Sequence, residues 1–293
     1  MASNFSLPSD LTDQISLADW LELLALRSPD NNASHGDLER ELNRAGVDNS
    51  ESICSLTLGE LNQRVIAAGN NYPFTFSGSL LKVKNDWRSF TPYIFCLLLS
   101  YCEDAKKKVS KLNHEVMFEH LSCLAAKKYI DGEALRFGSP RADDPLPSAF
   151  LAAMTNVCGT VGEWSCTRTS NSLRKKDGGL DLIAWKPFPD RQIGKLVLFG
   201  HCASGNNWNS KINELQPNDF CSKWLGGDRS PIVKSFFIPH RVTAEIFEDR
   251  AISAKLFFDR CRIALWAVND EFCQTTQNGN IRWCEKILKR IYP

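Results

Sequence analysis

Apolar residues recur at helical spacing through the first part of the chain. The run LADWLELLAL (17–26) places apolar side chains three and four positions apart, and residues 55–69 and 91–107 repeat this pattern. Gly69 suits the C-terminus of a helix. We therefore expect residues 1–110 to form an all-helical N-terminal domain that regulates the rest of the chain or binds a partner.

The pattern changes after residue 110, where strand-like runs alternate with helices. Two apolar runs, 180–185 and 195–202, are joined by nine residues that include two prolines and a glycine. Such a connection suits an antiparallel pair, whereas a helix between 195–202 and the next run, 231–242, permits a parallel pair. Further elements are expected as helices over 111–130, 149–164, 243–254 and 281–292, a loop over 132–147 and a strand within 254–268. The sequence thus predicts an α/β domain over 111–293, with a mixed β-sheet flanked by helices.

A single acidic residue, Asp181, interrupts the first of these apolar runs. Burying an unpaired carboxylate costs several kcal/mol. Asp181 must therefore lie at a strand end or contact a positive group. A metal ion is one such group, and a basic side chain is the other.

Charge and composition exclude few classes of function. The formal net charge is +1, so the chain has no global basic field, and a nucleic-acid site would have to be a local patch. A basic cluster directly before Asp181 is the candidate, either as phosphate contacts or as an ordinary solvated loop. Its members are Arg168, Arg174, Lys175 and Lys176.

The cysteines indicate a reducing compartment. There are 11 of them, an odd number, and none forms a CxxC pair. The first residues lack the basic and apolar regions of a secretory signal, and no apolar run approaches the roughly 20 residues of a membrane helix. We therefore expect free thiols, a cytoplasmic location, no structural zinc site and no membrane association.

Three stretches follow one another in a characteristic order. A helix carries a glutamate in FEHL (118–121), a strand reads DGGLDLIAW (177–185), and the next strand ends in GHCASG (200–205). This order resembles the PD-(D/E)XK restriction-endonuclease-like nucleases, and most closely their Mrr-like branch, many of whose members serve bacterial defence. The similarity covers Lys111 to Ala267. It implies a restriction-endonuclease-like mixed sheet and a metal-dependent nuclease.

The resemblance implies a role for each matching acidic residue. Asp181 matches the metal-binding aspartate at the centre of the sheet. Glu119 or Glu163 matches the additional acid of the first core helix, and FEHL favours Glu119. These carboxylates would hold Mg²⁺ or Mn²⁺, which activates the attacking water and neutralises developing charge.

The second half of the motif departs from the family. The strand after Asp181 should supply an acid or a glutamine, followed two residues later by a lysine, but this chain has His201 and Ala203 there. His201 is either a site residue, able to ligate a metal through a neutral imidazole, or a core histidine. Lys211, which lies downstream, is the nearest replacement for the missing catalytic lysine, and Lys195 lies at the other end of the strand. An ordinary surface lysine is the alternative interpretation of Lys211.

Two functions are consistent with these residues. The first is a metal-dependent DNA endonuclease, the nuclease component of a bacterial anti-phage defence system, with a helicase, ATPase or sensor protein as partner and a homodimer as an option. The second is a catalytically decayed nuclease-fold module that binds nucleic acid or a partner protein. An unrelated α/β enzyme has no support, because GxGxxG, GxxxxGK[ST] and GxSxG motifs are absent.

Overall fold

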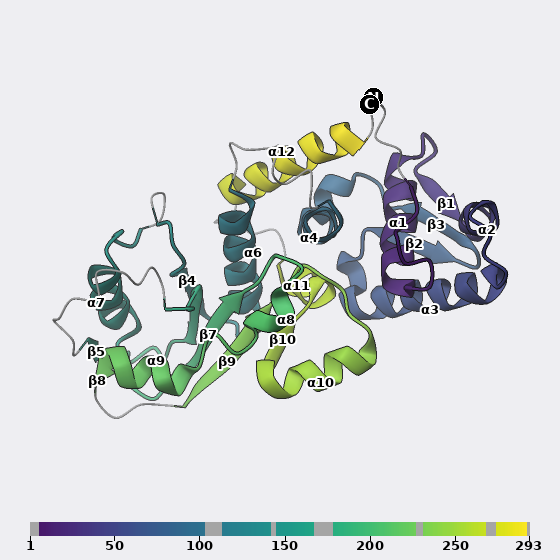
Figure 1. Cartoon of the computed structure of the whole chain (residues 1–293). Helices are drawn as coiled ribbons and strands as arrows, with labels where there is room; N and C mark the ends of the chain where they lie inside the picture. The colour runs from purple at the N-terminus through teal and green to yellow at the C-terminus, as the bar shows by residue number, and fades with distance from the viewer. Residues whose placement is uncertain are drawn as a thin grey trace.

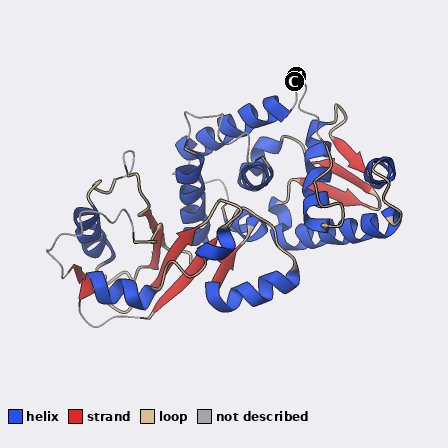
Figure 2. Ribbon diagram, in the orientation of Figure 1, coloured by secondary structure: helices blue, strands red, loops and turns tan. Residues whose placement is uncertain are grey.

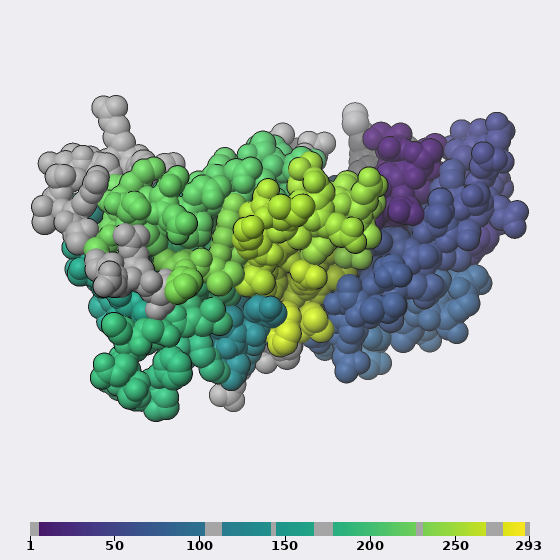
Figure 3. Space-filling view, turned by 90° about the horizontal axis from the view of Figure 1, so that it is seen from below, coloured from purple at the N-terminus to yellow at the C-terminus, as the bar shows by residue number. Residues whose placement is uncertain are grey.

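The protein has a larger mixed sheet toward one end and a smaller sheet among helices at the other. The computed structural model describes residues 6–102, 113–141, 145–166, 178–226, 231–267 and 274–291. The ribbon diagrams show the two sheets and the helices between them (Figures 1 and 2). The space-filling view shows purple and blue N-terminal residues at one end and green residues at the other (Figure 3). Within the described ranges, no helix combines the length and apolar character needed to cross a membrane.

The N-terminal region contains strands as well as helices. Its helices are α1 (Gln14–Arg27), α2 (His35–Arg44), α3 (Ser50–Ala68) and α4 (Thr91–Tyr101), with 3₁₀ turns η1 (Gly69–Asn71) and η2 (Trp87–Phe90). Its strands are β1 (Asn32–Ser34), β2 (Phe74–Ser77) and β3 (Leu80–Val83). They pair antiparallel in the order β1-β3-β2. The prediction of an all-helical region is therefore wrong.

The run 80–83 is open to interpretation as a strand, and it is β3. The missed strands β1 and β2 are only three and four residues long, too short for a two-residue period to stand out. β2 and β3 form a hairpin in which Ser77 pairs with Leu80. Gly78 lies in the turn with a φ of 62°, a conformation that glycine adopts without steric penalty. Burial of Phe74 and Leu81 in the core holds the hairpin against the N-terminal helices.

The larger sheet has five strands in the order β10-β9-β7-β6-β4. The strands are β4 (Glu133–Arg136), β6 (Leu182–Lys186), β7 (Leu196–Cys202), β9 (Ile232–Phe237) and β10 (Leu256–Phe258). β4, β6 and β7 are antiparallel neighbours, whereas β7, β9 and β10 run parallel. The predicted mixed sheet is confirmed, including the antiparallel β6–β7 pair and the parallel β7–β9 pair.

Strand β4 corrects the prediction of a loop over 132–147. Its sequence, EALR, has a charge at each end and only two apolar residues, so it carries no strand pattern. Pairing with β6 decides its conformation, because Leu135 lies opposite Ile183 in the sheet. The charged end residue Arg136 is buried and contacts Glu119 of the covering helix.

Helices cover both faces of the large sheet. They are α6 (His114–Tyr129), α7 (Phe150–Val161), α8 (Trp208–Lys211), α9 (Pro217–Trp224), α10 (Ala244–Ala254) and α11 (Arg260–Trp266). The last helix, α12 (Gln274–Ile291), packs on other helices instead. A small pair of strands, β5 (Ser165–Cys166) and β8 (Leu225–Gly226), accompanies the large sheet. Leu182 and Leu198 face α6 and α11. Ile183 and Phe199 face α7 and α9, and Phe236 faces α10. This alternation follows the two-residue period of strands.

One apolar core continues across residue 110. The same cluster contains Leu17 of α1, Leu182 of β6 and Leu288 of α12. Helix α12 packs against α4 and α6, so the C-terminal segment lies on the N-terminal region (Figure 1). The division into two domains at residue 110 stays a prediction.

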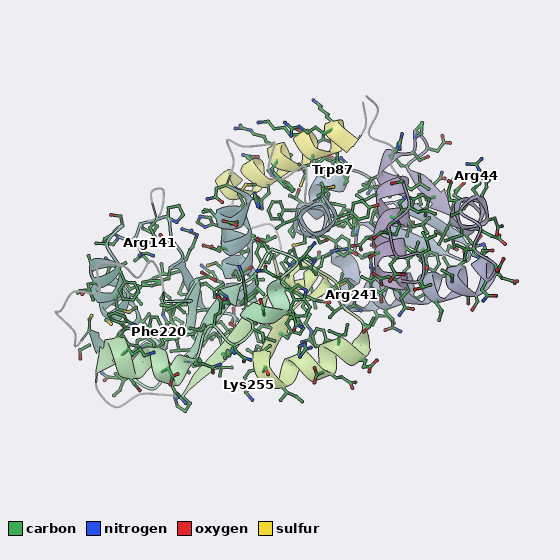
Figure 4. The ribbon with its side chains drawn as sticks, viewed as in Figure 1. Arg44, Trp87, Arg141, Phe220, Arg241 and Lys255 are labelled. Carbon is green, nitrogen blue, oxygen red and sulfur yellow. The ribbon has the colours of Figure 1, made fainter. Side chains whose placement is uncertain are left out.

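A buried ion-pair network crosses the same junction. Arg260 of α11 is fully buried and donates to both carboxylate oxygens of Asp19 in α1, at 2.6 and 2.9 Å. Arg64 of α3 contacts the same carboxylate at 2.6 Å. Arg241 lies at this junction (Figure 4) and donates to Glu60 of α3 at 3.0 Å. The network ties the N-terminal helices to the end of the large sheet.

Candidate functional site

Asp181 lies directly before β6, at the edge of the sheet where β6 begins and β4, β7 and β9 end. Its N–H donates to the carbonyl of Gly200 on β7 at 2.9 Å. Its own carbonyl accepts from Phe137 and Gly138, which follow β4, at 2.7 and 3.0 Å. Asp181 is buried, and its backbone is fixed from both sides.

The two glycines before Asp181 shape the turn that positions it. Gly178 and Gly179 have φ values of 67° and 82°. A Cβ atom on Gly179 would lie 3.3 Å from the carbonyl oxygen of Glu214. Glycine at this position therefore lets the turn approach the segment that follows α8.

His201 is the side-chain hydrogen-bond partner of the Asp181 carboxylate. Its Nδ1 atom lies 2.7 Å from Oδ2 of Asp181, and the backbone N–H of Cys202 donates to the same oxygen at 2.7 Å. Asp181 is thus both at a strand end and in contact with an ionisable base. The strand-end condition inferred from the sequence is met, and the partner of the carboxylate is a histidine, which is positive only when it is protonated.

The far side of the His201 ring faces a second carboxylate. Nε2 lies 3.3 Å from Oε2 of Glu214, whose side chain is 53% exposed. Burial favours the neutral ring, but the hydrogen bond to Asp181 and the charges of Asp181 and Glu214 outweigh it and raise the pKa of His201. The charge of Lys211 lowers this pKa in part, so Lys211 of α8 acts on the same ring.

A buried lysine anchors the turn that carries Lys211. Lys234 of β9 donates from Nζ to the carbonyl of Ile212 at 2.6 Å. Burial lowers the pKa of Lys234. This bond holds the end of α8 against the sheet, beside the strand that carries His201.

Glu119 lies at the same end of the sheet and contacts a basic side chain, Arg136. Its Oε2 atom is 2.7 Å from Nε of Arg136. A Cβ atom on Gly138 would lie 2.1 Å from this oxygen, so the carboxylate occupies the space that glycine leaves open. Burial, followed by the charges of Asp181 and Glu119, raises the pKa of Cys202 well above its ordinary value. Asp181 and Glu119 therefore both act electrostatically on the Cys202 thiol.

Glu163 is not part of this group. It accepts from the backbone N–H groups of Gly194 and Lys195 and from the Lys195 ammonium, at 3.0, 3.1 and 3.0 Å. Lys195 precedes β7 and His201 lies near its end, six positions later, which is about 20 Å along an extended strand. The structure therefore does not bring Glu163 together with Asp181, and Lys195 is also far from the site.

Two residues that follow His201, Ala203 and Trp208, pack into the apolar cluster beside α10. Ala203, at the position of the family's lysine, is buried in the core beside α10, and its N–H donates to Phe237. The ring of Trp208 packs beside that of Phe257, with 5.9 Å between the ring centroids. The proposed phosphate-binding cluster of Arg168, Arg174, Lys175 and Lys176 lies outside the described residues.

The described residues do not fit the magnesium site that the resemblance implies. Mg²⁺ binds through several hard oxygen ligands in near-octahedral geometry. Within the described ranges, no group of three or more His, Cys, Asp and Glu side chains is arranged to hold a metal ion. The carboxylate of Asp181 faces His201, and that of Glu119 faces Arg136. Each acid thus already contacts a basic side chain where a metal would bind.

Sequence reasoning missed three residues of this site. Glu214 follows Lys211 by three positions, a spacing that brings two charges to one side of a helical turn. Arg136 went unnoticed because its strand has no apolar alternation. Lys234 lies within an apolar run, and a lysine in such a run signals a buried partner in the same way as Asp181.

Comparison of the chain with models of protein families, with curated proteins and with solved structures finds no match.

Proposed function

We propose that this protein is a nuclease of restriction-endonuclease-like fold that hydrolyses phosphodiester bonds of DNA at the Asp181 end of its large sheet. The arrangement of elements supports the fold. Helix α6 carries Glu119, and β6 and β7 are adjacent strands that bring Asp181 and His201 together. These are the relative positions that the sequence resemblance implies.

The observation that carries the proposal is the convergence of proton-transferring and charged groups at one strand end. Asp181 and His201 form a bonded pair, Glu214 lies on the other side of the ring, and Lys211 acts electrostatically on that ring. Phosphodiester hydrolysis needs a group that accepts a proton from water and a positive charge near the phosphate. The imidazole and the ammonium group supply these two functions.

A nuclease-fold module that binds without cleaving is the second candidate. Ala203 is buried where the family has its lysine, and Glu119 is paired with Arg136. Both features remove groups on which metal-dependent cleavage depends. In this alternative the ligand is nucleic acid or a partner protein. The defence role and an ATPase or sensor partner belong to the first proposal and follow from the resemblance alone.

A plasmid assay tests the proposal. The full-length protein and its Asp181→Asn variant are incubated with supercoiled DNA in Mg²⁺, in Mn²⁺ and in EDTA, and nicked and linear forms are quantified. Asp190→Asn is the matched control, because Asp190 is an exposed acid of the β6–β7 connection. Cleavage that depends on Asp181 but not on Asp190 supports the nuclease. DNA binding by the wild type without cleavage under any condition would establish the binding module instead.

A further inference from the structure

We infer that His201, oriented by Asp181, accepts the proton of the attacking water in a phosphodiester hydrolysis that needs no metal ion, with Lys211 as the cation beside the phosphate. This inference rests on the proposed nuclease function and specifies how its site works. It departs from the family expectation at the position where the family has an acid or a glutamine.

The orientation of the ring follows from its fixed partner. An ionised carboxylate only accepts hydrogen bonds, so Asp181 holds the Nδ1–H form of the neutral ring. The Cys202 N–H bond to the same oxygen keeps that carboxylate in place. The lone pair of the neutral ring is then on Nε2. A carboxylate that orients an imidazole in this way is a general device for making a histidine an effective base.

The solvent side of Nε2 is covered by a group that can move. His201 has 8% of its side chain exposed, whereas Glu214, 3.3 Å from Nε2, has 53% exposed. Glu214 also lines a surface cavity of about 220 Å³ together with Gly178, Asn213 and Lys223. Displacement of the Glu214 side chain by a substrate phosphate places water against Nε2. Asn213 and Lys223 offer hydrogen-bond donors to the DNA backbone.

The chemical step balances without a co-reactant. Nε2 of neutral His201 takes a proton from water while the water oxygen bonds to phosphorus. The bond from phosphorus to the leaving ester oxygen, on the opposite side, breaks, and that oxygen takes a proton from solvent water while Nε2 returns its proton to solvent. One water is consumed, a phosphomonoester and a free hydroxyl form, and no atom changes oxidation state. The Lys211 ammonium neutralises charge on the phosphoryl oxygens.

The decisive experiment compares cleavage with and without metal. Plasmid nicking by the full-length wild type is measured in EDTA and in Mg²⁺, beside His201→Gln and Lys211→Met. His35→Gln on α2 is the matched histidine control. We expect equal wild-type rates in EDTA and Mg²⁺, a loss of about 100-fold or more in His201→Gln, a smaller loss in Lys211→Met, and no change in His35→Gln.

The outcomes separate the inference from the proposed function. Cleavage that requires Mg²⁺, or a His201→Gln variant as active as the wild type in EDTA, overturns the metal-independent mechanism and leaves the nuclease intact. No cleavage by the wild type in any condition overturns both. Should His201→Gln fail to fold, two measurements on the wild type still test the metal-independent mechanism. Ring ¹⁵N NMR should show the Nδ1–H form for the neutral His201, and Mg²⁺ titration calorimetry should show no binding. The opposite tautomer or saturable Mg²⁺ binding would contradict the inference.

Discussion

The Nδ1 atom of His201 lies 2.7 Å from the Oδ2 atom of Asp181, across the adjacent strands β6 and β7. This contact explains how an acid can be buried at the start of a central strand. It also places an ionisable base at the strand position where the nucleases that the sequence resembles have an acid or a glutamine. The stability of the folded protein should therefore depend on the protonation of this histidine.

The first prediction concerns pH and His201. The pKa of His201 is raised on folding, so the protonated ring stabilises the folded protein. This stabilisation is fully present below the pKa of histidine in the unfolded chain, about 6.5, and is lost as pH rises through the pKa in the folded protein. Asp181, Glu214 and Lys211 are the charged groups that act on the ring. Urea unfolding of the wild type and His201→Gln should give a larger difference in free energy at pH 6 than at pH 9. Equal differences at the two pH values would contradict this prediction.

The second prediction concerns the pair of Glu163 and Lys195. Both side chains are buried, so Glu163→Ala leaves an unpaired ammonium and should cost about 3–5 kcal/mol. Although burial opposes it, the hydrogen bonds from Gly194 and Lys195 lower the pKa of Glu163. The stabilisation is therefore present above the unfolded pKa, about 4.3, and is lost as pH falls through the folded pKa. Denaturant titration at pH 7 and at pH 3 measures both effects.

The same pair also tests the location of the site. Because Glu163 lies at the other end of β7 from His201, the milder Glu163→Gln variant should cleave DNA at the wild-type rate, provided that it is folded. A selective loss of cleavage in a folded Glu163→Gln protein would show that Glu163 takes part in catalysis.

The third prediction concerns the junction between the N-terminal helices and the large sheet. Arg260→Met removes a guanidinium that donates to both oxygens of buried Asp19, and it should destabilise the protein by about 3–5 kcal/mol. Arg260→Lys should recover only part of this loss, because an ammonium cannot reproduce the two parallel bonds. The control Arg44→Met removes an exposed pair with Glu41 and should cost less than about 1 kcal/mol. Chemical denaturation of the three variants gives the comparison, and a neutral Arg260→Met would refute the role of the network.

The fourth prediction uses two glycines in opposite surroundings. A Cβ atom on Gly200 would lie 2.6 Å from Cγ of Leu182, so Gly200→Ala should destabilise the protein by about 1–3 kcal/mol through overpacking beside His201. Gly159 is exposed within α7 and has open space around it, so Gly159→Ala should stabilise by about 0.5–1 kcal/mol. Thermal melts should move in opposite directions. A Gly200→Ala melt at the wild-type temperature would show that Leu182 repacks freely.

The sequence by itself determined the long helices and the strands β6, β7 and β9 of the large sheet. Runs such as 195–202 are apolar enough, and their connections distinctive enough, that both their type and the direction of pairing could be predicted. The buried state of Asp181 was predictable for the same reason, since a charge within an apolar run requires a partner. Short strands such as β2 and β4 were beyond prediction, because three or four residues carry no period and their conformation depends on the strand beside them.

Only the tertiary structure decided which side chains meet. Asp181 and His201 are 20 positions apart, and the register of β6 against β7 brings them into contact. Glu119 and Glu163 were both candidate acids, with Glu119 favoured by its sequence context. Packing places Glu119 at the Asp181 end of the sheet, whereas Glu163, which follows α7, pairs with Lys195. Residue type and local pattern specify that a buried charge needs a counterpart. The identity of the counterpart depends on sheet register and helix packing, which bring together residues that are distant in the chain.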